Sequence, residues 1–175
     1  MVSKAVMVIK GVNMDGRQEI MAVEPMENES EQTYSALFRK LQEKEKKKVW
    51  LCVSDAHKGL EAAIRKTLPG TTWQRCKVHF MRNILAYVPQ THKETVASRL
   101  KLIWKAPDEK TARALKEDFC REYENRYPKA VECLEQGFED SIGFYAFEEL
   151  DSRKISSTNT LERLNREIRR RSSVV

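Results

Sequence analysis

The first 80 residues show the pattern of hydrophobic and polar positions that is typical of a small sheet with covering helices. Short apolar runs predict strands, and the Asp15-Gly16 pair between the first two predicts a hairpin turn. The third run is apolar on both faces, as in a central strand covered on two sides. The expected strands cover residues 5–9, 19–23, 49–53 and 71–78, and the expected helices cover residues 34–41 and 59–68. The order favours an α/β fold with a mixed sheet, antiparallel at its start and parallel afterwards.

The pattern changes after His79. From residue 81 to residue 150 no run favours a strand, and Pro89, Pro107 and Pro128 divide stretches with helical spacing. We therefore expect an all-helical insertion between the sheet and a last, basic helix. The predicted division is residues 1–80 for the α/β core, 81–150 for the insertion and 151–175 for the final helix that returns to the core.

Charge changes this picture at the C-terminal end. The net charge of the 175 residues is +6, and residues 152–175 hold seven cations and two anions, so five of the six net charges lie there. A helix this basic favours a polyanion such as nucleic acid, although a solvated helix face explains it equally well. No apolar run approaches 18 residues, so we expect no membrane span and a cytoplasmic protein. Four irregularly spaced cysteines predict reduced thiols.

Asp55 is the first candidate for chemistry. It follows the apolar strand at residues 49–53 and precedes His57 and Lys58. In open α/β sheets ligands bind beyond the carboxyl ends of strands, and a carboxylate there can hold a hard cation such as Mg²⁺. The alternative is an ordinary N-cap of the following helix, which position alone favours.

Glu162 is the second candidate, 107 positions further on. It lies in the first turn of the basic helix. A capping box with Asn159 and an i,i+4 pair with Arg166 explain it without any catalytic role. Cys76 and His79 have the spacing of half a zinc site, but no second half is present in the sequence, so no structural zinc is expected.

Three blocks of the chain together resemble the mutator-type transposases of bacterial insertion sequences. The blocks are residues 53–60 with Asp55, residues 69–83 with the Cys76-x-x-His79 motif, and residues 157–171 with Glu162. They occur in order and at suitable spacing, and the resemblance covers essentially the whole chain. That family is similar to the ribonuclease H and retroviral integrase group. The resemblance implies a ribonuclease-H-like sheet, a large helical insertion before the last catalytic helix, and three catalytic acids.

The resemblance also implies roles for particular residues. Asp55 would be the second catalytic acid and Glu162 the third, both holding Mg²⁺, with Mn²⁺ as a substitute; Cys76 and His79 would support the site. The implied reaction is metal-dependent phosphodiester cleavage and strand transfer on double-stranded DNA, at transposon ends and target. The candidate phosphate contacts are Lys58, Arg75, Arg82, Arg163, Arg166 and Arg170.

The chain departs from the family pattern at its start. The first strand and the first catalytic aspartate would lie upstream of Ser3, and Asp15, in the predicted turn, is no replacement. We therefore expect a catalytic-core fragment that is inactive alone, with a bare strand edge at residues 5–9. Self-association or pairing with a full-length transposase, near the nucleoid, is then expected. The alternatives are a non-catalytic DNA-binding or inhibitory fragment and, from Cys76 and His79 only, a zinc-dependent regulator.

Overall fold

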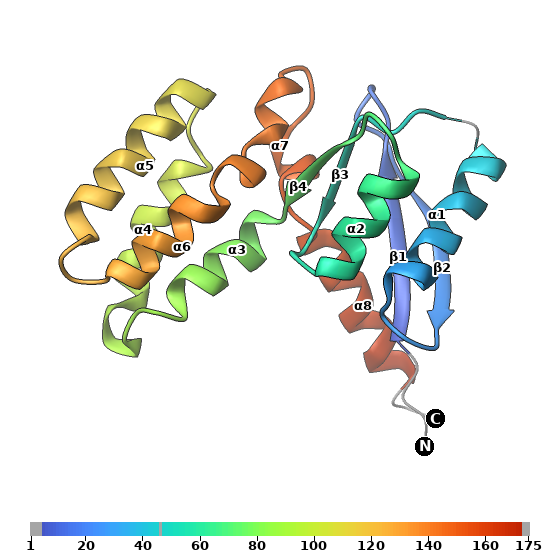
Figure 1. Cartoon of the computed structure of the whole chain (residues 1–175), viewed down its shortest axis with the longest axis horizontal. Coiled ribbons are helices and arrows are strands. Elements are labelled where there is room, and N and C mark those ends of the chain that lie inside the picture. The colour runs from blue at the N-terminus through green and yellow to red at the C-terminus, as the bar shows by residue number, and fades with distance from the viewer. Residues whose placement is uncertain (1–4, 46, 173–175) are drawn as a thin grey trace.

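The computed structural model describes residues 5–45 and 47–172. Four strands, with α1, α2 and α8 beside them, make up one side of the molecule, and helices α3 to α6 gather on the other (Figure 1). The fold is therefore mixed α/β, with small sheets and a large share of helix. The bounds of the elements explain how this arrangement follows from the sequence.

The chain begins with an antiparallel hairpin. β1 (Ala5–Val12) pairs with β2 (Gln18–Met26), and a register shift lies between Ile9 and Lys10. Gly16 in the turn has φ of 74°, a left-handed conformation that glycine adopts without a steric cost. The predicted hairpin is thus confirmed. Among the residues that the structure describes, β1 pairs with no strand other than β2.

The second pair of strands is parallel. β3 (Leu51–Ser54) leads into α2 (Lys58–Thr67), which returns the chain to β4 (Thr72–Arg75). β4 is shorter than the predicted strand at residues 71–78, because the chain turns into a helix directly after Cys76. The four strands were expected to form one mixed sheet, but the described residues contain two separate two-stranded sheets.

A shared hydrophobic core joins the two pairs of strands in place of hydrogen bonds. α1 (Glu31–Glu45) packs against α2, and both contribute to this core. Its fully buried centre is Ile64 of α2, and Trp73 brings in β4. Burial of apolar surface is not directional, so it can hold two sheets together whose strand edges do not meet.

The helical side is built around a second core. Its elements are α3 (Lys77–Leu85), α4 (Lys93–Ile103), α5 (Glu109–Tyr123) and α6 (Pro128–Gly137), with short 3₁₀ turns at Gln90–His92, Glu139–Ser141 and Gly143–Ala146. Phe80, Ile84 and Leu100 are fully buried there. Asp108 begins α5 by accepting a hydrogen bond from the backbone N–H of Thr111 at 2.7 Å, which is normal N-cap chemistry. No strand lies between residues 81 and 150, as the sequence predicted.

The last two helices lead the chain back to the strands. α7 (Ser152–Ile155) is a single turn, and α8 (Asn159–Ser172) runs beside β1 (Figure 1). Within residues 5–45 and 47–172, no helix has the length and apolar character needed to cross a lipid bilayer.

Candidate active site

Asp55 lies directly after the last residue of β3, and the structure assigns the helix cap to a different residue. The N-cap of α2 is His57, whose Nδ1 accepts the backbone N–H of Leu60 at 3.3 Å. The Asp55 side chain is exposed and, among the described residues, makes no hydrogen bond or ion pair. Capping therefore does not account for this carboxylate.

The backbone around Asp55 is held by a buried serine. The hydroxyl of Ser54 donates to the carbonyl oxygen of Asp55 at 2.8 Å and accepts from Nε1 of Trp73 at 2.9 Å. Ser54 and Trp73 are each only 7% exposed. The indole of β4 thus fixes the end of β3 at the point where Asp55 leaves the sheet.

The segment that leads into α8 is hydrogen-bonded along the end of β4 and the start of α3. Nε2 of the fully buried Gln74 donates to the carbonyl oxygen of Ile155 at 3.0 Å. The backbone N–H of Lys77 donates to the carbonyl oxygen of Ser156 at 3.2 Å. Both the backbone N–H and the hydroxyl of Thr158 donate to Sγ of Cys76 at 3.3 Å. These contacts join positions about 80 residues apart and place the first turn of α8 beside α3.

Glu162 directs its carboxylate at α3 and away from its own helix end. Its Oε2 accepts a hydrogen bond from Arg82 at 3.0 Å, and its Oε1 lies 3.1 Å from Nε2 of His79. The Oε1 atom is buried and has no hydrogen bond of regular geometry, although the His79 contact is close. The predicted capping box with Asn159 is therefore not formed by this carboxylate. Only 23% of the Glu162 side chain is exposed, so its two oxygens are largely withheld from bulk water.

The two carboxylates match part of what a hard cation requires. Asp55 offers oxygens without a protein partner, and Glu162 offers a buried oxygen without a regular hydrogen bond, and Mg²⁺ prefers such ligands. Ser54 links them: its carbonyl accepts the backbone N–H of Cys76 at 2.7 Å, and Cys76 in turn holds Thr158, four residues before Glu162. In the part of the chain that the structure describes, however, no three His, Cys, Asp or Glu side chains are grouped to hold a metal ion. Asp55 and Glu162 are thus the two carboxylates of the candidate site, one exposed and one largely buried.

Cys76 and His79 lie on the same side of α3 as Glu162. Cys76 is fully buried, and its Sγ is the acceptor for Thr158. The His79 ring lies between Thr158 Oγ1, 3.5 Å from Nδ1, and Glu162 Oε1, 3.1 Å from Nε2. Both residues of the motif therefore contact the start of α8. The cysteines Cys52, Cys76, Cys120 and Cys133 are all free thiols.

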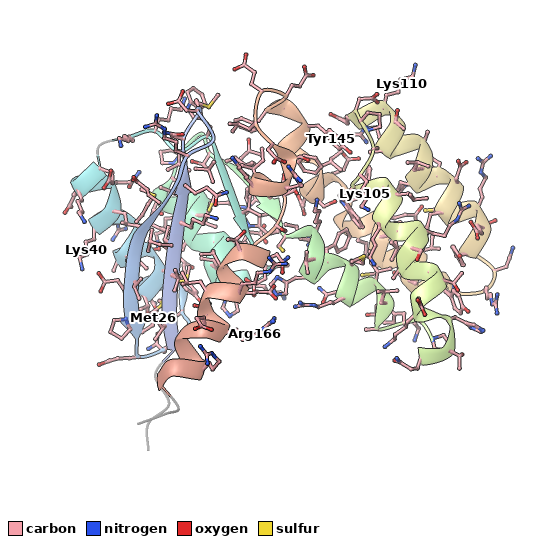
Figure 2. The ribbon with its side chains drawn as sticks, turned by 180° about the vertical axis from the view of Figure 1, so that it is seen from behind. Met26, Lys40, Lys105, Lys110, Tyr145 and Arg166 are labelled. Carbon is pink, nitrogen blue, oxygen red and sulfur yellow. The ribbon has the colours of Figure 1, made fainter. Side chains whose placement is uncertain are left out.

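The predicted DNA contacts fall into three groups. Lys58, Arg163 and Arg166 have no ion pair among the described residues, and Arg166 lies on the exposed side of α8 (Figure 2). Arg82 and Arg170 are exposed but paired, with Glu162 at 3.0 Å and Glu167 at 2.7 Å respectively.

Arg75 forms the third group by itself. Its side chain is 22% exposed and lies 3.8 Å from Asp140, over the ring of Phe80. Its buried Nε has no hydrogen-bond partner among the described residues. This environment is that of a packed residue between α3 and α6.

Sequence reasoning did not find Ser54, Trp73 or Thr158. Ser54 and Trp73 had no visible signal, because each only completes a strand pattern. Thr158 had one signal, since it directly precedes Asn159 at the predicted helix start. Only the fold brings Cys76 and His79 beside its hydroxyl.

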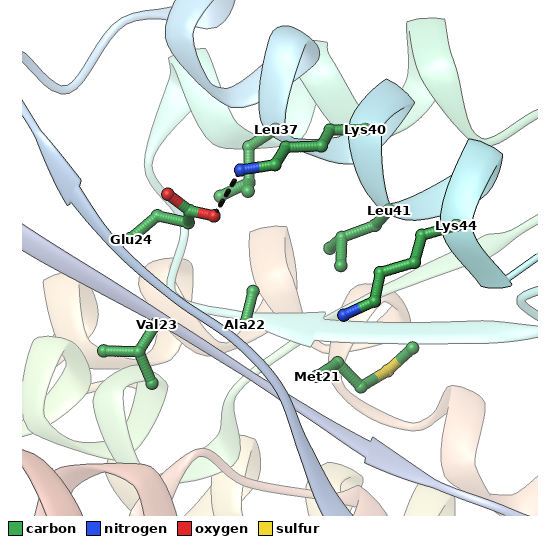
Figure 3. Close-up of a pocket in the computed structure, with 8 residues that line it drawn as sticks. All are labelled: Met21, Ala22, Val23, Glu24, Leu37, Lys40, Leu41 and Lys44. Atoms are coloured by element: carbon green, nitrogen blue, oxygen red, sulfur yellow. Dashed lines mark hydrogen bonds and ion pairs between the residues drawn. The ribbon is translucent and has the colours of Figure 1, made fainter.

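A cavity of about 240 Å³ lies elsewhere, between β2 and α1. Leu37 and Leu41 of α1 face it, and the ion pair of Lys40 with Glu24 spans its edge at 2.6 Å (Figure 3). None of the candidate site residues lines it. The candidate site residues therefore lie outside this cavity.

Comparison with known proteins identifies the family. The profile described as "Transposase, Mutator family" matches residues 1–175. The chain is 37% identical over 175 residues to the transposase for insertion sequence element IS256 in transposon Tn4001 of Staphylococcus aureus, covering 99% of this chain and 45% of that protein. It is 36% identical over 173 residues to the transposase for insertion sequence element ISRM5 of Rhizobium meliloti, covering 99% of this chain and 44% of that protein.

A third relative is the transposase for insertion sequence element IS1081 of Mycobacterium tuberculosis. It is 36% identical over 169 residues, which cover 97% of this chain and 41% of that protein. The chain thus spans a little less than half the length of these relatives. It is a member of the Mutator family of transposases.

Proposed function

We propose that this chain is part of the catalytic core of a DNA transposase and that Asp55 and Glu162 are two of its catalytic acids. The observation that supports this most strongly is the Glu162 carboxylate. It is turned toward α3, and its Oε1 is buried without a regular hydrogen bond. A buried carboxylate oxygen is costly to leave unsatisfied, so its retention favours a functional role. Family membership agrees with an enzyme that acts on DNA.

Asp55 and Glu162 would hold a divalent cation, Mg²⁺ in the cell, with Mn²⁺ able to replace it. A bound ion would supply an activated water or DNA 3′-hydroxyl and would stabilise the leaving oxygen of the phosphodiester. The contribution of this chain would be to present two carboxylates and to exclude water from one of them. Ser54 and Trp73 would fix the backbone at Asp55, and α3 would hold the carboxylate of Glu162.

The same proposal includes a ribonuclease-H-like arrangement for the α/β part, with residues 81–150 as an insertion before the last catalytic helix. The element order and the helical character of the insertion support it. In this arrangement the two catalytic acids come from opposite sides of the insertion. The hydrogen bonds of residues 155–158 to β4 and α3 would bring Glu162 back to the α/β part of the chain.

Double-stranded DNA is the proposed substrate, bound first through its phosphates. Lys58, Arg163 and Arg166 are the best-placed cations, because they are free of carboxylate partners among the described residues. Arg82 and Arg170 would contribute by exchanging a carboxylate for a phosphate. Arg75 remains among the proposed contacts, but its packed position favours a supporting role over a phosphate contact.

A second candidate is a DNA-binding or inhibitory fragment without catalysis, or an assembly partner of a full-length transposase. The absence of a third acidic ligand beside Asp55 and Glu162 within residues 5–45 and 47–172 favours it. Two carboxylates alone are expected to bind Mg²⁺ weakly and to support little cleavage. The basic surface of α8 would still bind DNA.

Plasmid nicking under single-turnover conditions distinguishes these proposals. The purified chain, its Asp55→Asn variant and its Glu162→Gln variant are incubated with supercoiled DNA and Mn²⁺, and DNA binding is measured in parallel. Weak nicking that both substitutions abolish, with binding unchanged, supports the catalytic proposal. Salt-dependent binding with no nicking supports the fragment. Nicking that survives both substitutions contradicts the assignment of the acids.

A further inference from the structure

A continuous series of side-chain contacts connects Cys76 to Glu162. The hydroxyl of Thr158 donates to Sγ of Cys76 at 3.3 Å, and the same oxygen lies 3.5 Å from Nδ1 of His79. On the other side of the ring, Nε2 of His79 lies 3.1 Å from Oε1 of Glu162. Each nitrogen of the imidazole therefore faces a different residue of the α8 start.

The two ends of this series differ in rigidity. Cys76 is fully buried, and its backbone N–H is bonded to Ser54 at 2.7 Å, so its sulfur is a fixed point at the end of β4. The Glu162 side chain has several rotatable bonds and sits in the first turn of α8, where a carboxylate would otherwise be free to swing. Thr158 and His79 connect the fixed end to the mobile end.

Arg82 alone does not provide the same restraint. Its side chain is 56% exposed, against 30% for His79, and it is one helical turn further along α3. An exposed ion pair contributes little and is easily exchanged for another anion. Because His79 is the less exposed of the two and its two ring nitrogens lie 3.5 Å from Thr158 and 3.1 Å from Glu162, it is the better-ordered partner of the carboxylate.

We propose that His79 is a positioning residue that holds the Glu162 carboxylate in its working orientation, and that Thr158 and Cys76 orient the His79 ring. Nδ1 faces the Thr158 hydroxyl, and Nε2 faces Glu162. This gives the Cys-x-x-His motif a structural assignment, in which the cysteine anchors Thr158 and the histidine holds the acid. The proposal rests on the proposed role of Glu162 as a catalytic acid.

Two substitutions of His79 separate its two contacts. The amide of glutamine reaches about as far as Nε2 of histidine, so His79→Gln keeps a donor for Glu162. The amide of asparagine is shorter and reaches only to the position of Nδ1, so His79→Asn keeps the Thr158 contact and loses the Glu162 contact. A histidine that served only to fill space would be replaced equally well, or equally badly, by both.

His92 provides a matched control. Its Nδ1 lies 2.6 Å from the Tyr127 hydroxyl and its Nε2 lies 3.3 Å from Arg126, so His92→Asn makes the same kind of change at a site within the helical side. Thermal unfolding of every variant shows whether it folds. Thr158→Val, which keeps the side-chain shape and removes the hydroxyl, takes the place of His79→Asn if that variant does not fold.

Two readouts are made on the 175-residue chain. The first is deuterium exchange of the Glu162 backbone amide, measured without metal. This N–H donates to the backbone carbonyl of Thr158 at 3.0 Å. The second is binding of Mn²⁺ alone, followed by electron paramagnetic resonance. We expect His79→Asn, or Thr158→Val in its place, to speed exchange and to weaken Mn²⁺ binding by about fivefold or more. His79→Gln should stay within about twofold of the wild type, as should His92→Asn.

The outcomes separate this proposal from the proposed function. The positioning role is overturned if the Asn and Gln variants of His79 behave alike, whether both change or neither does. If His79→Asn does not fold, wild-type behaviour of Thr158→Val overturns it. Glu162→Gln tests the function independently. If that substitution leaves Mn²⁺ binding unchanged, the catalytic assignment of Glu162 fails, while the exchange rates still decide whether His79 positions it.

Discussion

Substitution of Ser54 by alanine should destabilise the protein much more than its small change in volume suggests. The hydroxyl has two partners, the indole N–H of Trp73 at 2.9 Å and the carbonyl of Asp55 at 2.8 Å. Alanine removes both hydrogen bonds at once. It also leaves the indole N–H of a residue that is 7% exposed without an acceptor.

The expected loss follows from these two contacts. A neutral intramolecular hydrogen bond contributes about 1 kcal/mol net, and a buried donor left unsatisfied costs about 1–3 kcal/mol. Together they predict that Ser54→Ala lowers the free energy of unfolding by about 2–4 kcal/mol. For a chain of this length that corresponds to a fall in Tm of about 4–16 °C.

Urea denaturation followed by circular dichroism at 222 nm measures this loss. Ser98→Ala is the matched control, because the Ser98 hydroxyl donates to the carbonyl of Glu94 at 3.0 Å on an exposed helix face. That control should change the free energy of unfolding by less than about 0.5 kcal/mol. A loss below about 0.5 kcal/mol for Ser54→Ala would refute the reasoning.

A double-mutant cycle with Trp73→Phe assigns the loss to the contact itself. Phenylalanine removes the indole N–H, so Ser54→Ala leaves no orphaned donor in that background. The double variant should therefore lose about 1 kcal/mol less than the sum of the two single variants. Additive losses would mean that the two side chains are not coupled.

Three further predictions concern packing, thiol chemistry and pH. Gly137→Ala would place a Cβ 2.6 Å from the Phe80 ring, so overpacking should cost about 1–3 kcal/mol in urea denaturation, and an unchanged midpoint would contradict it. Burial raises the pKa of the Cys52 thiol to about 12, so Cys52 should resist thiol reagents at pH 8 in the native chain and react fully in urea; rapid native labelling would contradict this. Hydrogen bonds from Arg99 and Arg113 lower the pKa of Glu122 and Glu139 below the ordinary 4.5. The contribution of these ion pairs to stability is therefore complete above about pH 4.5 and is lost as the pH falls through the lowered pKa values. Tm should fall between pH 5 and pH 3, and it should fall less steeply in an Arg113→Gln variant. Parallel curves of Tm against pH for the two proteins would contradict a contribution of the Arg113 ion pair.

The sequence predicted the elements of this fold better than their assembly. The Asp15-Gly16 turn and the apolar runs indicated the hairpin and β3, because these signals are local. The pairing of strands is not local, and the expected single sheet is two separate pairs among the described residues. The strand at residues 71–78 was predicted too long, since the apolar and polar order of that stretch does not show where the chain turns into α3.

The candidate site shows the same division between local and distant effects. Local rules offered an N-cap role for Asp55 and a capping box for Glu162, and neither describes the side chains in the structure. His57 caps α2, and Glu162 faces α3. The contact that decides the first case is local, because His57 lies two residues from Asp55. The contacts that decide the second case come from residues about 80 positions from Glu162, which no local pattern can indicate. The roles of Asp55 and Glu162 in catalysis remain predictions.

The measurement that tests the central claim most directly is iron-directed cleavage of the protein. Fe²⁺ replaces Mg²⁺, ascorbate and peroxide generate radicals at the bound ion, and mass spectrometry locates the cuts in the backbone. If Asp55 and Glu162 hold one cation, the chain is cut near both residues, and either Asp55→Asn or Glu162→Gln removes both sets of cuts, while Asp108→Asn removes neither. Cuts near only one of the two residues, or cuts that survive both substitutions, would contradict a shared site.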